Sequence, residues 1–254
     1  MPLIKSLRML VFAFALGVGG CVSAEHSRPP EVRNIVLVHG AFVDGSGWQG
    51  VYRSLTARGY TVNIVQNPLT SLADDVAAVD RVLARQDGPA LLVGHSYGGV
   101  VITEIGSSPV VAGLMYVAAY APDQGESISS LRGDDPPPPF QTSSDGFLFF
   151  DPAAFPQAFA QDIDTGVSVF LAASQVPTAQ AAFASPVSSV AWRNKPSWFV
   201  ISTEDRIIPP DMQRRMAARA NAAITEIEGS HAIYLSQPEA VADAIDQAAR
   251  SLVQ

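Results

Sequence analysis

Residues 94–98 read Gly94-His95-Ser96-Tyr97-Gly98, and this stretch decides the fold that we expect. The apolar residues 89–93 precede it, and residues 99–105 continue with the composition of a buried helix. A Gly-x-Ser-x-Gly sequence between a strand and a helix presents its serine at the edge of a sheet, because the small flanking residues let strand and helix pack closely. A serine hydroxyl is a poor nucleophile on its own, so the motif is informative only if a base and an acid lie elsewhere in the chain.

The composition of the 254-residue chain indicates one globular domain with a large core. Hydrophobic residues make up 48% of the sequence and charged residues 16%, which argues against disorder over most of its length. The net charge is −8 and the sequence has no cluster of lysine and arginine, so we expect no nucleic-acid partner. Cys21 is the only cysteine, which excludes an internal disulfide.

The N-terminal 24 residues are predicted to be an export signal. Lys5 and Arg8 precede an apolar run over residues 9–18, which has about the length of a signal-peptide core and is too short for an ordinary transmembrane helix. We therefore expect an exported protein that is periplasmic, secreted or lipid-anchored at the cell envelope.

Two processing sites compete within this signal. Residues 22–24, Val-Ser-Ala, resemble an ordinary small-residue cleavage site. Residues 18–21, Val-Gly-Gly-Cys, resemble a bacterial lipobox, and cleavage before Cys21 would give a lipidated N-terminus and a membrane tether. The sequence leaves the choice open. Residues 25–33 are polar and contain two prolines, and they are expected to form a short tether to the domain.

Between residues 34 and 254 buried strands alternate with helices. The strands are continuous apolar runs, as is typical of strands buried on both faces of a parallel sheet. The alternation predicts an α/β fold with a doubly wound, mostly parallel sheet flanked by helices, with its site at the carboxyl ends of the strands. The predicted strands cover residues 34–39, 61–66, 89–93, 110–119, 196–203 and 223–227, and the predicted helices cover residues 48–58, 71–86, 99–105 and 211–220.

The regular pattern breaks over about residues 123–194. This segment is rich in turns and prolines, has no strand periodicity and contains only short helical pieces such as residues 164–174. An insertion of this length is more often a functional lid than a plain connection, so we predict a helical lid. We also expect some of its aromatic side chains to face a binding pocket. The aromatic residues are Phe140, Phe147, Phe149, Phe150, Phe155, Phe159, Phe170 and Phe183.

The loop after the first strand is rich in glycine but does not predict a nucleotide cofactor. Its spacing over residues 40–48 is not G-x-G-x-x-G, and no acidic residue ends the next strand to hold a ribose. The loop is instead suited to present the backbone N–H of Ala41 to a developing oxyanion. We expect no cofactor and no metal, since the sequence has no H-E-x-x-H motif and no cysteine cluster.

Asp205 and His231 each come just after a predicted strand, so both are expected at the same sheet edge as Ser96. They are 26 residues apart in the chain. The order serine, aspartate, histidine is the one found in catalytic triads that are built on a Gly-x-Ser-x-Gly turn. These residues are therefore predicted to form a Ser-His-Asp triad.

With these motifs in place, the chain from residue 35 onward resembles the α/β-hydrolase superfamily. It is most similar to the branch that contains plant methylesterases, hydroxynitrile lyases and bacterial esterase-like relatives. The matching stretches are Val38-His39-Gly40-Ala41 with Gly47-Trp48, residues 94–99, Tyr116-Val117-Ala118-Ala119-Tyr120-Ala121-Pro122, Asp205-Arg206-Ile207-Ile208-Pro209 and Gly229-Ser230-His231.

The resemblance, together with the chemistry of the residues, implies a role for each site residue. Ser96 is expected to attack an acyl carbonyl, and His231 to take its proton and return it to the leaving alcohol. Asp205 is expected to hold the imidazole tautomer and stabilise its charged form. The backbone N–H groups of Ala41 and Tyr97 would form the oxyanion hole.

Some neighbouring residues compete for these roles. Asp123 is a rival for the acid, because some members of the superfamily place it after the preceding strand, and Glu204 is a weaker rival. His39 and His95 resemble metal ligands only by residue type, and we expect them to support the site or to pack within it.

The resemblance also restricts the reaction. Hydroxynitrile lyases of this branch carry a threonine where Gly40 stands and a lysine where Ala232 stands, so both positions point towards ester hydrolysis. A dehalogenase would need an aspartate in place of Ser96. We therefore expect a hydrolase of a small, mostly apolar carboxylic ester or lactone.

Two other classes of function stay open. One is a ligand-binding or receptor-like protein that keeps the pocket with weak turnover. The other is cofactor-independent lyase, perhydrolase or oxygenase chemistry on the same scaffold. Saturable turnover of simple esters would separate hydrolysis from binding, whereas the natural substrate and the oligomeric state do not follow from the sequence.

Overall fold

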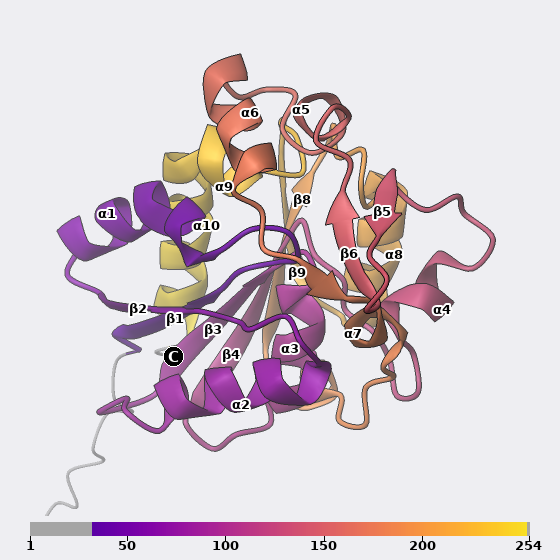
Figure 1. The fold of residues 1–254 in the computed structure, drawn as a ribbon. Coiled ribbons are helices and arrows are strands. Elements are labelled where there is room, and N and C mark those ends of the chain that lie inside the picture. Colours follow the sequence, from indigo (N-terminus) through magenta and orange to yellow (C-terminus); the bar gives the residue numbers. More distant parts are fainter. Residues whose placement is uncertain (1–31, 253–254) are drawn as a thin grey trace, which may run out of the picture.

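A computed structural model describes residues 32–252 of the chain (Figure 1). The predicted signal peptide, Cys21 and nearly all of the predicted tether lie outside the described residues, so export and lipidation stay predictions. Within the described part, no helix is both long enough and apolar enough to cross a bilayer.

A six-stranded sheet forms the centre of the fold, in the order β2-β1-β3-β4-β8-β9. Every neighbouring pair is parallel, which confirms the predicted doubly wound, mostly parallel sheet. The inner strands are apolar because helices cover both faces, whereas the edge strands β2 and β9 are partly exposed and carry polar residues. The bounds are β1 Asn34–Val38, β2 Thr61–Val65, β3 Ala90–His95, β4 Val111–Val117, β8 Ser197–Ser202 and β9 Ala223–Ile227.

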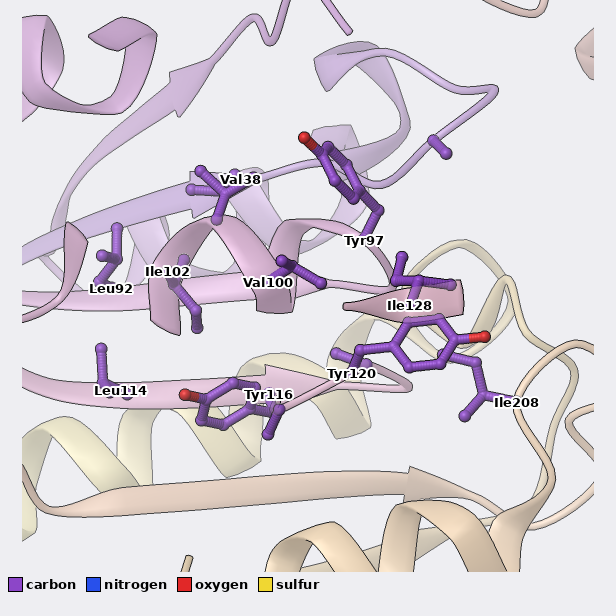
Figure 2. Packing of buried hydrophobic residues seen from close by; sticks show 14 of the residues in the cluster. Val38, Leu92, Tyr97, Val100, Ile102, Leu114, Tyr116, Tyr120, Ile128 and Ile208 are labelled. Atoms are coloured by element: carbon purple, nitrogen blue, oxygen red, sulfur yellow. The ribbon is translucent and has the colours of Figure 1, made fainter. Parts of the chain in front are cut away.

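Alternate residues of each strand face opposite sides of the sheet, and each side has its own hydrophobic core. Ile35 and Leu37 of β1 belong to the core beneath α1 and α10, whereas Val36 and Val38 belong to the core beneath α2, α3 and α8. Figure 2 shows part of the second core, where Val100 of α3 lies near the strands. The bounds are η1 Gly45–Trp48, α1 Gln49–Ala57, α2 Leu72–Leu83, α3 Gly98–Ile105, α8 Pro210–Arg219, α9 Ile233–Ser236 and α10 Pro238–Ser251.

The predicted elements differ from the observed ones mainly at their ends. The strand predicted over residues 110–119 ends at Val117, because Ala118 takes a φ of 44° and leaves the extended conformation. The helix predicted over residues 71–86 has Ser71 as its N-cap, since the serine side chain accepts a hydrogen bond from the backbone N–H of Asp74.

Residues 123–194 form a mixed layer and not only the short helices that we expected. A small antiparallel sheet in the order β5-β6-β7 runs through the segment. Its strands are too short to show a two-residue periodicity, so they could not be predicted from the sequence. Figure 1 shows these elements grouped at the upper and right-hand sides of the molecule. They are α4 Ile128–Arg132, β5 Phe140–Thr142, β6 Phe147–Phe150, α5 Phe155–Ala158, α6 Thr165–Ala173, β7 Thr178–Ala179, α7 Gln180–Ala184 and η2 Ala191–Arg193.

Candidate active site

Ser96 lies on the sharp turn between β3 and α3 and has a φ of 52°, in the left-handed region that L-residues disfavour. Such a conformation costs about 1 kcal/mol or more and persists only where the surroundings enforce it. The motif glycines make the turn possible. A Cβ on Gly98 would lie 2.7 Å from the carbonyl oxygen of Val38, and a Cβ on Gly94 would lie 2.6 Å from that of Gly98. The side chain of Ser96 is thereby held at the carboxyl end of the sheet, 7% exposed.

The loops after β8 and β9 bring Asp205 and His231 to the serine. These strands are parallel neighbours, so both loops leave the sheet at the same edge. His231 Nε2 lies 2.8 Å from Ser96 Oγ, and His231 Nδ1 lies 2.8 Å from Asp205 Oδ2. The three side chains therefore form one continuous hydrogen-bonded chain, and all three residues are buried.

The carboxylate of Asp205 is fixed by donors on both of its oxygens. Oδ1 accepts hydrogen bonds from the backbone N–H groups of Ile207 and Ile208 at 2.8 and 2.9 Å. Oδ2 accepts from Gln213 Nε2 at 2.8 Å in addition to its contact with His231. These donors suit an ionised carboxylate, which accepts but does not donate.

The rival acids lie elsewhere. Asp123 forms a hydrogen-bonded ion pair with Arg193, at the surface. Glu204 is exposed, and its backbone bonds to Gly229 and Gln161. His231 therefore has Asp205 as its carboxylate partner.

His39 and His95 are both buried and hydrogen-bonded within the protein. His39 Nε2 accepts from the backbone N–H of Asn67 at 2.9 Å, and its Nδ1 lies 2.8 Å from the carbonyl oxygen of Gly40. His95 Nε2 lies 2.9 Å from the carbonyl oxygen of His231. Burial lowers the pKa of His39 and lowers that of His95 well below its usual value. Across residues 32–252 no His, Cys, Asp and Glu side chains gather as a metal site would require.

Ala41 and Tyr97 flank the serine on the same pocket. Tyr97 directly follows Ser96, and Ala41 lies in the turn after β1. Neither backbone N–H forms a hydrogen bond with another described residue.

The pocket above Ser96 is walled chiefly by apolar side chains. Half of the aromatic residues noted in the sequence of the 123–194 segment line it. The other wall residues come from the loops after the strands of the main sheet, from α4 and from the loop between α4 and β5. The lining residues are Ala41, Phe42, Ser96, Tyr97, Tyr120, Ile128, Arg132, Pro138, Phe140, Phe150, Phe159, Phe183, Ile207 and His231.

Several residues that shape this site carry no sequence motif. Gln213 holds Asp205, Asp162 Oδ2 accepts from the backbone N–H of Ser230 at 2.8 Å, and Arg132 lines the pocket. Gln213 could have been noticed as a polar residue beside Met212 on the buried face of α8. The other two show no periodicity that would single them out.

A family model described as "Alpha/beta hydrolase family" matches residues 35–244. The chain therefore belongs to the α/β-hydrolase family, as the sequence predicted. Among curated proteins, it is 26% identical over 250 residues to alpha/beta hydrolase nvfD of Aspergillus novofumigatus, with 87% of this chain and 98% of the relative covered. It is 28% identical over 244 residues to a pyrethroid hydrolase of Sphingobium wenxiniae, with 84% and 86% covered.

Solved structures show the same fold. The crystal structure of pyrethroid hydrolase PytH matches with a TM-score of 0.76 at 24% identity, covering 88% of this chain and all of the other, 100%. The crystal structure of polyneuridine aldehyde esterase matches with a TM-score of 0.75 at 18% identity, covering 85% and 98%. A methylesterase protein from Arabidopsis also shares the fold, with a TM-score of 0.71 at 18% identity, covering 85% of this chain and 98% of the other.

Proposed function

We propose that this protein is a serine carboxylic ester hydrolase that cleaves a small, mostly apolar ester or lactone through an acyl-enzyme on Ser96. The observation that carries the proposal is the chain of two 2.8 Å contacts from Ser96 through His231 to Asp205, at the base of an apolar pocket. The relatives support it, since they include a pyrethroid hydrolase and a carbendazim hydrolyzing esterase.

The acylation step follows from the contacts of His231. Its Nδ1 carries the proton that is donated to Asp205, so Nε2 is free to accept the proton of Ser96 as the oxygen attacks the acyl carbon. The imidazolium then returns this proton to the leaving alcohol. Three donors other than His231 fix the carboxylate of Asp205. The carboxylate in turn accepts from Nδ1 of His231, which holds the imidazole in the tautomer that the reaction needs.

The oxyanion would be stabilised by Ala41 and Tyr97. Their N–H groups face no internal acceptor in the described chain, and both residues line the pocket with Ser96. Preorganised donors of this kind commonly contribute about 3–4 kcal/mol each to transition-state stabilisation. Water would then attack the acyl-enzyme, with His231 acting as the base a second time.

The pocket supports an apolar substrate. Four phenylalanines from the 123–194 segment line it, and burial of apolar area is the main source of binding energy that such walls offer. We propose that this segment acts as the lid and that its aromatic side chains select the size of the acyl or alkyl group. Phe140, Phe150, Phe159 and Phe183 are the side chains concerned.

Lyase chemistry is less well supported. A Cβ on Gly40 would lie 2.8 Å from Ser96 Cβ and 2.9 Å from His95 Nδ1, so the threonine of the lyase branch would not fit without rearrangement. Ala232 is a fully buried alanine and supplies no ammonium group where that branch carries a lysine.

Hydrolysis of p-nitrophenyl esters graded from acetate to decanoate tests the proposal. We expect turnover that peaks at one chain length and is lost in Ser96→Ala. Ser251→Ala, an exposed serine at the end of α10, is the matched control and should retain full activity. No turnover at any chain length by the wild-type protein would contradict the esterase function and favour a binding role.

A further inference from the structure

We propose that Asp75 is a positioning residue that holds both oxyanion-hole donors, Tyr97 and Ala41, through a buried hydrogen-bond network. The inference rests on the proposed ester hydrolysis at Ser96 and goes beyond it. Asp75 lies on α2, outside the pocket, and it would act only through the residues that it holds.

The first arm of the network leads to Tyr97. Asp75 Oδ2 accepts a hydrogen bond of 2.6 Å from the Tyr97 hydroxyl, and both side chains are fully buried. Tyr97 follows Ser96 directly, and its backbone N–H is one of the proposed donors. The tyrosine ring is thus fixed at its far end as well as at its backbone, which limits rotation of the peptide that carries the N–H.

The second arm leads towards Ala41. Asp75 Oδ1 accepts from the backbone N–H of Leu69 at 2.8 Å, and the carbonyl oxygen of Leu69 accepts from the N–H of Ala179 at 2.8 Å. The residue before Ala179 is Thr178, whose Oγ1 accepts from the N–H of Phe42 at 3.3 Å. Phe42 follows Ala41, so one carboxylate is connected to the neighbourhood of both donors.

The backbone along this network is strained. In the described chain five residues other than glycine have a positive φ, and three of them are Phe42 (65°), Leu69 (57°) and Ser96 (52°). A side chain with a Cβ avoids this region unless its surroundings enforce it. Leu69 and Phe42 both lie on the second arm, and Ser96 is the nucleophile that precedes Tyr97, which indicates that the network maintains the geometry of the turn and the oxyanion loop.

Asp75 itself lacks a cationic partner among the ion pairs of residues 32–252. Burial raises its pKa to about 6, so the carboxylate is still ionised at neutral pH. Its hydrogen bonds to Tyr97 and Leu69 are therefore charge-assisted and stronger than neutral ones. Capping of α2 does not need this residue, because Ser71 caps the helix.

Two substitutions test the role, and a third substitution is the matched control. Tyr97→Phe removes only the hydroxyl, and Asp75→Asn removes the charge. Tyr60→Phe removes a tyrosine–aspartate hydrogen bond of 2.7 Å, to Asp246, and neither of these residues lines the pocket. For each variant we would measure kcat and KM on the best p-nitrophenyl ester, the thermal midpoint, and the affinity for a trifluoromethyl ketone and for the product acid.

The serine adds to the carbonyl of a trifluoromethyl ketone to give a tetrahedral oxyanion, whereas the product acid forms no such adduct. We expect Tyr97→Phe and Asp75→Asn to lower kcat and the ketone affinity by about tenfold, with KM and acid affinity changed less than about twofold. The double variant should lose little more kcat than the single variant with the larger loss, because both substitutions break the same hydrogen bond. Tyr60→Phe should retain kcat.

Several outcomes would overturn the inference. Unchanged kcat in Tyr97→Phe would do so even if Asp75→Asn fails to fold. Equal losses of ketone and acid affinity, or an equal loss of kcat in Tyr60→Phe, would indicate a purely structural role. If the wild-type protein hydrolyses no ester, the proposed function itself fails, and that result is distinct from normal hydrolysis with unaffected variants.

Discussion

His95 Nε2 lies 2.9 Å from the main-chain oxygen of His231, so the residue before the nucleophile holds the backbone of the base. The two rings also lie with their centroids 4.8 Å apart. Since the acceptor is a carbonyl, Nε2 must carry the proton, and burial together with the charge of His231 lowers the pKa of His95 well below its usual value. The lowered pKa favours a neutral His95 that donates from Nε2.

This relationship predicts the effect of His95→Phe. The change leaves a buried carbonyl without its donor, which costs about 1–3 kcal/mol of unfolding free energy, and it frees the base to shift. We expect kcat to fall about tenfold. His95→Gln can place an amide N–H near the same position and should recover part of the loss. Equal kcat for wild type and His95→Phe in steady-state assays would contradict the positioning.

The partner of Asp205 gives a second prediction. Gln213→Glu would place a second carboxylate beside Asp205 Oδ2, where the amide now donates at 2.8 Å. Additional negative charge near the imidazole favours its protonated form and raises its pKa. The acidic limb of the kcat/KM profile should therefore move to higher pH. A profile that coincides with the wild-type one would show that Gln213 does not act on the base.

Gly40 gives a third prediction, based on space. Gly40→Ala should lower kcat by at least about tenfold, because the new Cβ would lie 2.8 Å from Ser96 Cβ and 2.9 Å from His95 Nδ1. Gly88→Ala is the matched control, since a Cβ there meets only Asn34 Nδ2, at 3.6 Å. Steady-state kinetics of both variants test this prediction. Similar kcat values for the two variants would show that a Cβ at position 40 does not disturb Ser96.

The fourth prediction concerns the pH dependence of stability. Burial raises the pKa of Asp75 to about 6 in the folded state, above its unfolded value, so the folded protein binds more protons between pH 4 and 6. The stability that Asp75 contributes is therefore present at low pH and lost as pH rises through about 6.

Urea unfolding of wild type and Asp75→Asn at several pH values isolates this effect. As the pH falls from 7 to 4, the free energy of unfolding of the wild-type protein should rise by up to about 3 kcal/mol relative to that of the variant. A difference between the two proteins that does not change with pH would show that Asp75 titrates normally.

The fifth prediction concerns pocket size. Phe140 lines the pocket above Ser96, and Phe140→Ala should enlarge it, so the preferred p-nitrophenyl ester should become longer. Phe170→Ala is the control, because Phe170 is 67% exposed on α6 and does not line this pocket. An unchanged chain-length profile in Phe140→Ala would place the acyl group elsewhere.

The sheet, the turn at Ser96 and the candidates for base and acid could be predicted from the amino-acid sequence. These features are encoded locally. Buried parallel strands are continuous apolar runs, and the turn at Ser96 needs small residues at Gly94 and Gly98, where a Cβ would meet backbone atoms. The order of strands then places the residues that follow them at one edge, which made Asp205 and His231 candidates.

Which of the candidate side chains contact one another depends on how the strands and helices pack in space. Asp123 also follows a strand, and it is the pairing of β8 with β9 that places Asp205 against His231 while Asp123 pairs with Arg193. The antiparallel sheet within residues 123–194 was not predicted either, because its strands are too short for a periodic signal. The bond between Asp75 and Tyr97 joins residues 22 positions apart, on separate helical segments. Such contacts depend on distances between packed elements, and no local sequence pattern records those distances.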